Sequence, residues 1–207
     1  MLYDICLPDG FTERKEYPLF LCMHCDSGSI GNIETHRRYW KPDAMLACGF
    51  IVVCIQSSYL LSSIGYGWSD DAPRRREDIR KCFDEVGAQY KIDKEKVIVS
   101  GFSGGALAAI DAALHDIIPV REFIAMSPDK PEDFSKEKCK NAFQRGVRGV
   151  LMEGELAGSD VDVEEMKTVF NQTGLPYEVF INEGIGHWYP DDLPAKTGKA
   201  ISFILNE

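Results

Sequence analysis

The chain has 207 residues, of which 44% are hydrophobic, and it carries a formal net charge of −10 at pH 7. This length suggests a single domain over residues 1–207 with a core of its own. An acidic chain without clustered Lys and Arg is a poor candidate for nucleic-acid binding. No apolar stretch approaches the roughly 20 residues that cross a bilayer, so we expect no membrane partner.

The cysteine content indicates a reducing environment. There are seven cysteines, an odd number, and Cys22 and Cys54 lie within apolar runs where a thiol behaves as a small hydrophobic group. No cationic segment followed by an apolar run opens the chain. We therefore expect a cytoplasmic protein with free thiols, although a removed signal peptide stays an open alternative.

The first half of the chain reads as strands separated by loops and one helix. We expect strands over Tyr3–Pro8 and Leu19–His24, then a helix over Arg37–Cys48. The continuous apolar run Phe50–Gln56 predicts a strand buried on both faces. The polar, glycine-containing stretch Ser57–Asp71 follows and is a candidate functional loop.

The second half alternates regularly between the two element types. We expect helices over Pro73–Tyr90, Gly105–His115, Val163–Asn171 and Ala195–Leu205. We expect strands over Lys96–Ser100, Phe123–Ser127, Val150–Glu153 and Tyr177–Asn182. This alternation predicts an α/β fold, with a mostly parallel sheet covered by helices on both faces.

A Gly-x-Ser-x-Gly motif, Gly101–Gly105, joins a buried strand to a helix. A serine nucleophile must stand clear of the sheet on a tight, strained turn, and the residues two before and two after it then press together. The free N–H groups at the start of the helix favour developing negative charge. The motif therefore predicts that Ser103 is a nucleophile.

An attacking serine needs a base, and His187 is the best placed of the four histidines. It lies in GIGHWYP, after the last expected strand, where Gly184 and Gly186 allow a sharp turn. The others are expected to be packing or surface residues: His24, His36 and His115.

Three segments, VIVSGFSGG, GIGHW and the opening LYDICLPDGFTERKEYPLFLCMH, together resemble the α/β-hydrolase superfamily, and within it esterases and peptidase-like hydrolases. The resemblance implies a serine hydrolase that cleaves a small-molecule carboxylic ester through an acyl-enzyme, with no metal or organic cofactor. Peptidase or thioesterase activity, or a binding protein that has lost catalysis, are the alternatives. The segment between Ser127 and Arg148 is too short for a large lid.

The resemblance also implies an oxyanion hole. One donor is the N–H of Gly104, and the second comes from the loop in which relatives often have His-Gly. Here the loop reads His24-Cys25-Asp26, so the second donor is expected from Cys25 or Asp26. A carboxylate pointing at an oxyanion is unfavourable, so we expect either that the Asp26 side chain faces away or that Cys25 is the second donor.

A triad acid is expected after the strand Val150–Glu153, and three residues compete for this role: Asp160, Glu155 and Asp162. We favour Asp160, because it lies on a turn next to a glycine, whereas Asp162 suits a helix N-cap. An acyl pocket could be lined by aromatic loop residues: Trp188, Tyr66 and Trp68. The run Arg74–Arg76 is either a substrate-carboxylate site or a solvated helix start.

Overall fold

The structure is a computed structural model, and it describes residues 2–26, 40–63, 65–157 and 161–205. Within these residues the main sheet has seven strands in the order β1-β3-β2-β6-β7-β8-β9. The strands are β1 (Leu2–Cys6), β2 (Tyr17–Met23), β3 (Ile51–Gln56), β6 (Ile92–Phe102), β7 (Glu122–Met126), β8 (Arg148–Gly154) and β9 (Tyr177–Asn182). All neighbouring strands are parallel except β1, which is antiparallel to β3.

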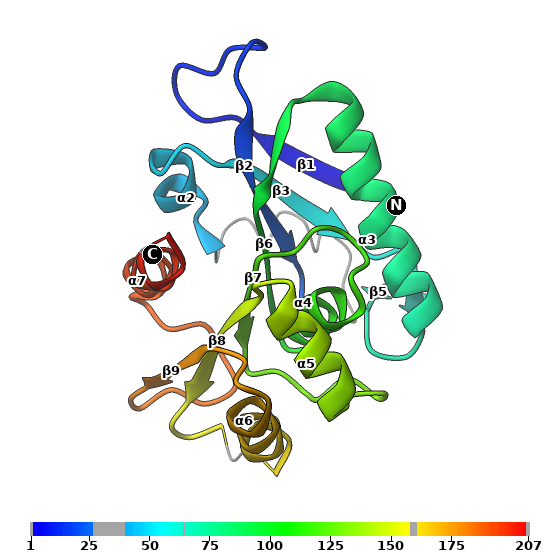
Figure 1. The fold of residues 1–207 in the computed structure, drawn as a ribbon, viewed down its shortest axis with the longest axis vertical. Helices are drawn as coiled ribbons and strands as arrows, with labels where there is room; N and C mark the ends of the chain where they lie inside the picture. The colour runs from blue at the N-terminus through cyan, green and yellow to red at the C-terminus, as the bar shows by residue number, and fades with distance from the viewer. Residues whose placement is uncertain (1, 27–39, 64, 158–160, 206–207) are drawn as a thin grey trace.

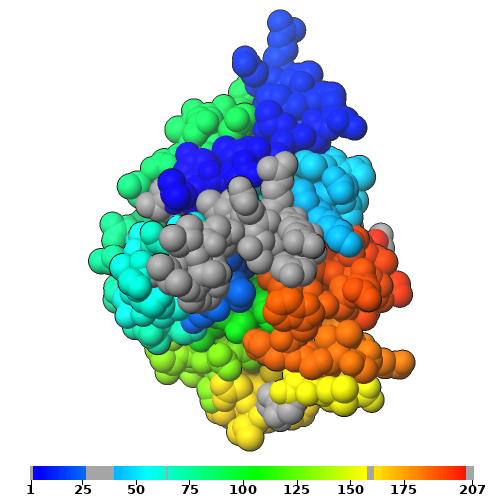
Figure 2. All heavy atoms as spheres, turned by 180° about the vertical axis from the view of Figure 1, so that it is seen from behind, coloured from blue at the N-terminus to red at the C-terminus, as the bar shows by residue number. Residues whose placement is uncertain are grey.

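Helices cover both faces of this sheet (Figure 1). They are α2 (Asp43–Ala47), α3 (Ala72–Gln89), α4 (Gly104–His115), α5 (Lys136–Gln144), α6 (Val161–Thr173) and α7 (Leu193–Leu205). Helices α3 to α6 pack on one face, while α2 and α7 pack on the other, where they lie side by side (Figure 2). The expected mostly parallel sheet with helices on both faces is confirmed. No helix in the described ranges is long and apolar enough to cross a membrane.

Two hydrophobic cores follow from the period-two geometry of the central strands. In β2, Leu19, Leu21 and Met23 face the core under α3 to α6, whereas Phe20 and Cys22 face the core under α2 and α7. Because both faces are buried, the strand is apolar at nearly every position rather than at alternate ones.

Within the described residues, the expected helix over 37–48 is present but shorter than expected. Helix α2 has only five residues, and the chain before it turns at Lys41, whose φ is 44°. Residues 37–39 lie outside the described ranges. The residue before a proline is disfavoured in the helical region, so Pro42 starts a new helix instead of extending one.

Two short elements were not expected from the sequence. A hairpin of β4 (Leu60–Ser62) and β5 (Gly65–Tyr66) forms within the loop 57–71. Helix α5 is capped by the Ser135 hydroxyl, which accepts from the Lys138 N–H at 3.4 Å. Only Cys139 and Ala142 of α5 are buried, so its apolar stripe is too thin to recognise.

All seven cysteines are free thiols. These include Cys22 and Cys25, whose Cys-x-x-Cys spacing occurs in redox pairs. Here Cys22 lies within the extended strand β2, while Cys25 follows the end of that strand. Burial raises the pKa of both thiols, which disfavours reactive thiolates.

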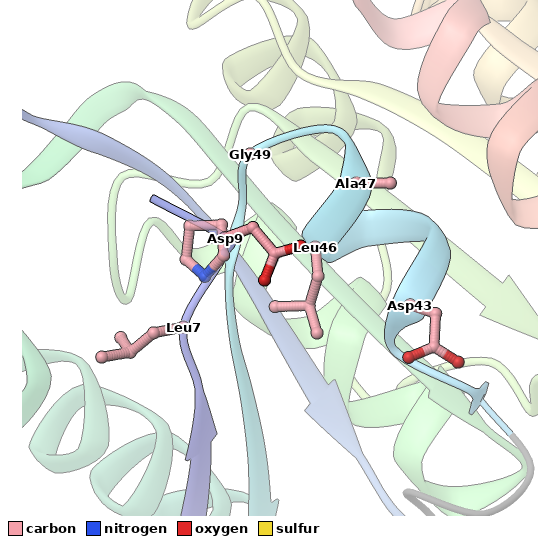
Figure 3. Close-up of a pocket in the computed structure, with 7 residues that line it drawn as sticks. Leu7, Asp9, Asp43, Leu46, Ala47 and Gly49 are labelled. Atoms are coloured by element: carbon pink, nitrogen blue, oxygen red, sulfur yellow. The ribbon is translucent and has the colours of Figure 1, made fainter. Parts of the chain in front are cut away.

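A pocket of about 400 Å³ lies at the amino ends of the parallel strands, between the β1–β2 connection and α2. Leu7 and Asp9 line it from one side, and Asp43 and Leu46 from the other (Figure 3). The loops that carry the expected catalytic residues lie at the opposite, carboxyl ends of the strands.

Candidate active site

The carboxyl ends of the parallel strands gather the segments expected to carry the chemistry. Ser103 follows β6, His24 to Asp26 follow β2, and Glu155 follows β8. The loop with His187 follows β9. In an open α/β sheet, ligands bind outside the carboxyl ends of the strands, so this edge is the candidate site.

Ser103 occupies a strained turn between β6 and α4. Its φ is 56° and its ψ is −121°, a conformation that costs a non-glycine residue free energy. A β carbon on Gly101 would lie 2.2 Å from the backbone of Gly105, and one on Gly105 would lie 2.3 Å from the carbonyl oxygen of His24. Both glycines are therefore required by close backbone contacts, as the motif predicts.

Neighbouring elements fix this turn. The Ser103 N–H donates to the Met126 carbonyl of β7 at 2.9 Å, and the Ser103 carbonyl accepts from the N–H groups of Ala106 and Leu107. In the described residues no carbonyl accepts from the Gly104 N–H, the first of helix α4. This N–H is thus available as an oxyanion donor.

His187 lies beside the nucleophile turn, with its ring centroid 4.8 Å from that of Phe102, the residue before Ser103. The ring is exposed. Within the described ranges no hydrogen bond joins it to the Ser103 hydroxyl. Such bonds are often long before substrate binds, so the arrangement is compatible with a base that closes on the hydroxyl when substrate arrives.

The loop that carries His187 is anchored to the end of β8. A β carbon on Gly154 would lie 2.2 Å from the Gly186 carbonyl oxygen. The Gly184 N–H donates to the Glu155 carboxylate at 2.8 Å, and the Leu156 N–H donates to the Ile185 carbonyl at 2.7 Å. The Glu155 side chain thus anchors this loop through the Gly184 N–H.

Two of the three candidates for the triad acid have other partners in the structure. Asp160, the favoured candidate, lies outside the described residues. Asp162 accepts from the Lys130 N–H at 3.0 Å and lies near the Lys130 ammonium, so its carboxylate binds the loop after β7. Glu155 is engaged with Gly184. Asp160 therefore stays a prediction.

His24 is buried and bridges the ends of two strands. Its Nε2 accepts from the Ser57 N–H at 3.0 Å, and its Nδ1 lies 2.6 Å from the Cys25 carbonyl oxygen, to which it can donate. Burial lowers the pKa of His24 to about 4, so the ring is neutral at neutral pH. It holds the candidate oxyanion loop against the segment after β3.

The Asp26 side chain does not face away as expected, because its carboxylate lies directly against the nucleophile turn, where the Trp68 N–H binds it. Its carboxylate oxygen is 2.2 Å from the position that a β carbon on Gly104 would occupy, and 2.8 Å from that position on Gly67. It accepts from the Trp68 N–H at 2.6 Å. Two glycines and one backbone donor thus form a niche that holds this carboxylate.

The predicted aromatic residues lie in different environments. Trp68 is completely buried, and its ring centroid lies 5.3 Å from that of His24 with the rings tilted at 45°, so its ring belongs to the core. Tyr66 is half-buried on β5. Trp188 is 55% exposed and packs edge-on against Tyr189. Of the three, Trp188 presents the most surface to solvent.

Arg75 matches neither interpretation offered for the run Arg74–Arg76. Its side chain is completely buried, its Nη1 donates to the Trp68 carbonyl at 2.6 Å, and its Nε donates to Asp111 of α4 at 3.0 Å. It also pairs with Glu132. Arg75 therefore ties the Trp68 segment to the helix that begins after Ser103, a long-range role with no local sequence signal.

Three potential metal ligands surround a guanidinium group. Asp111, His115 and Asp133 place their ligand atoms within 4.8 Å of one another. The Arg76 Nη2 lies 2.7 Å from Asp111, 3.0 Å from His115 and 3.2 Å from Asp133. The position of a metal ion is thus filled by Arg76. His115, expected at the surface, is part of this network.

Ser127 was not singled out from the sequence. It follows β7 directly, is buried, and has a φ of 46°. In the described part of the chain its hydroxyl has no hydrogen-bond partner. Strained residues and unpaired buried groups tend to cluster at functional sites, and this one is next to the peptide that binds Ser103.

No family model and no curated protein matches the chain. Solved structures match its fold. An uncharacterized protein from Bacillus cereus ATCC 10987 matches 95% of this chain with a TM-score of 0.81 and 27% identity. The present chain covers only 62% of the length of that protein. Esterase PE8 has a TM-score of 0.73 and 17% identity over 98% of both chains. A ferulic acid esterase has a TM-score of 0.76 and 16% identity, over 98% of this chain and 90% of that one. The chain has the α/β-hydrolase fold.

Proposed function

We propose that this chain is a serine hydrolase that cleaves a carboxylic ester through an acyl-enzyme intermediate. The observation that supports this most strongly is the backbone of Ser103, held at a φ of 56° on a glycine-lined turn at the start of α4. Strain of this kind exposes a side chain at the edge of a sheet. The helix start beside it supplies a free N–H at Gly104.

In the proposed reaction the Ser103 Oγ attacks the ester carbonyl carbon, and His187 accepts the hydroxyl proton. The Gly104 N–H and an N–H from Cys25 or Asp26 stabilise the oxyanion. Collapse of the intermediate breaks the ester C–O bond, and His187 returns the proton to the leaving alcohol. Water then repeats the sequence on the acyl-enzyme, with Asp160 orienting the imidazole.

Hydrolysis of methyl butanoate, a small unactivated ester, tests this proposal. We expect Ser103→Ala to lower kcat by about a thousandfold or more, because only binding and oxyanion contacts remain. Ser202→Ala is the matched control, since it removes an exposed hydroxyl on α7 far from this edge. Circular dichroism should show both variants folded. A Ser103→Ala variant that retains normal turnover would exclude the mechanism.

The same assay separates ester cleavage from the peptidase and thioesterase alternatives. Butanoyl thioester and butanamide offer the same acyl group with different leaving groups. We expect the oxygen ester to have the highest kcat/KM relative to its uncatalysed rate. If kcat/KM relative to the uncatalysed rate is higher for the amide than for the ester, the result would favour a peptidase.

A further inference from the structure

The carboxylate of Asp26 lies beside the proposed oxyanion hole, where a negative charge does not help the hydrolysis of a neutral ester. It rests on the α-carbon of Gly104, whose N–H is the proposed oxyanion donor. A fixed anion at this distance opposes negative charge that develops on the substrate carbonyl oxygen. Its presence calls for a compensating positive charge.

The protein does not supply that charge within the described residues. The only hydrogen bond to Asp26 comes from the neutral Trp68 N–H, and no Lys, Arg or His there forms an ion pair with it. The neighbouring His24 is neutral. Arg75, the cation attached to the Trp68 carbonyl, is committed to Asp111 and Glu132.

The segment after β9, at the same edge of the sheet, is also acidic. The segment after β9 carries Glu183, Asp191 and Asp192, while Lys196 beside them is paired with Asp192 at 3.0 Å. Acidic side chains around a site raise the local concentration of cations and repel anions. The whole chain, at −10, has the same sign.

The hydrogen bond to Trp68 does not explain the charge by itself. A neutral amide oxygen would also accept from the Trp68 N–H, although more weakly, so this bond does not require a charge. The niche formed by Gly67 and Gly104 leaves no side chain between the carboxylate and the nucleophile turn. Asp26 is also only half-buried, so a ligand can reach it.

We infer that Asp26 binds a positively charged group of the substrate, so that the preferred substrates are esters bearing an ammonium group near the scissile carbonyl. This inference rests on the proposed hydrolase function. The bound ammonium would neutralise Asp26 in the complex and remove its repulsion of the oxyanion. Anionic substrates would be the poorest, because they meet both Asp26 and the acidic segment after β9.

Three methyl esters of similar size test the inference. β-Alanine methyl ester carries an ammonium group, methyl butanoate has a methyl group in its place, and monomethyl succinate carries a carboxylate. We expect kcat/KM to fall in this order, with a ratio of about tenfold or more between the first two. The ratio should shrink as salt is raised.

Asp26→Asn is the decisive variant, since it keeps the acceptor for Trp68 and the backbone N–H but removes the charge. It should bring the ratio of β-alanine ester to methyl butanoate close to one, chiefly by slowing the cationic ester. Glu183→Gln removes a charge from the loop after β9 and should change the ratio less than about twofold. If Asp26→Asn slows both esters equally, the residue only braces Trp68 and the inference is wrong.

A binding measurement keeps this test separate from the hydrolase proposal. β-Alaninamide and butanamide are titrated into the wild-type protein and into Asp26→Asn, and amide chemical shifts are followed by NMR. We expect β-alaninamide to bind more tightly, only when Asp26 is present. If no ester is cleaved but this binding is seen, the hydrolase proposal fails and the cation site stands. Equal binding of both amides would overturn the cation site.

Discussion

At the scale of single residues, the candidate site depends on positions where no side chain fits. Gly105 shows this most clearly, because a β carbon there would meet the carbonyl oxygens of both His24 and Met23 at 2.3 and 2.4 Å. Those atoms belong to the backbone of a central strand and its loop, which cannot move aside cheaply. The turn of Ser103 therefore packs on β2 only when this residue is glycine.

We expect Gly105→Ala to lower the free energy of unfolding by about 3 kcal/mol or more, because overpacking here displaces backbone. Gly87→Ala on α3 is the control, since nothing lies within 4 Å of its β-carbon position. It should raise the free energy of unfolding by about 0.5–1 kcal/mol through helix propensity. Urea denaturation measures both, and a Gly105→Ala variant as stable as wild type would show that the turn and β2 can separate.

At the scale of secondary-structure elements, a buried ion network joins α3, α4 and the loop after β7. Asp111 and Arg75 have completely buried side chains, and Arg76 adds a second guanidinium. Burial alone would raise the pKa of Asp111, but hydrogen bonds from His115 and Arg76 and the charge of Arg75 hold it well below its usual range. The carboxylate therefore stays ionised in the folded protein.

We expect Asp111→Asn to lower the free energy of unfolding by about 3 kcal/mol, because it leaves two guanidinium groups short of a partner. Asp133→Asn, at the exposed end of the network, should cost less than about 1 kcal/mol. Because the pKa of Asp111 is lowered on folding, its contribution is present above the ordinary carboxyl pKa and is lost in acid. Thermal unfolding at pH 7 that is equal for the two variants would contradict this account.

The same elements show how far the sequence predicts the site. The nucleophile turn is a local motif, and the β-strand before it and the helix after it were recognisable from their own residues. Arg75 was not, because its partners Asp111 and Glu132 are far away along the chain. The niche of Asp26 was equally hidden, since it needs Gly67 from another loop and Gly104 from the start of α4. Contacts of this range follow from topology rather than from local pattern.

At the scale of the whole molecule, stability should depend on pH through a carboxylate far from the site. Glu122 begins β7 and is 8% exposed. Burial raises its pKa to about 7, against the opposing charges of Arg148 and Arg121. Because the folded pKa is raised, its favourable contribution is complete below the ordinary pKa of 4.5 and is lost as pH rises through about 7.

We expect Glu122→Gln to raise the free energy of unfolding by on the order of 2 kcal/mol at pH 8, and by much less at pH 5. Glu77→Gln is the matched control, since it makes the same change at an exposed position of α3. Thermal melts of the three proteins at both pH values make the comparison. A gain for Glu122→Gln that is the same at pH 5 and pH 8 would mean that Glu122 does not titrate in this range.

The central claim concerns one atom, the Ser103 Oγ, and its reactivity can be measured directly. A fluorophosphonate ester is added to the folded protein, and the adduct is counted by intact mass and located by peptide mapping. We expect one phosphonyl group per chain, attached to Ser103, with none on the Ser103→Ala variant and a rate about a thousandfold lower on His187→Ala. A folded protein that takes up no label, or takes it up elsewhere than Ser103, would contradict the account.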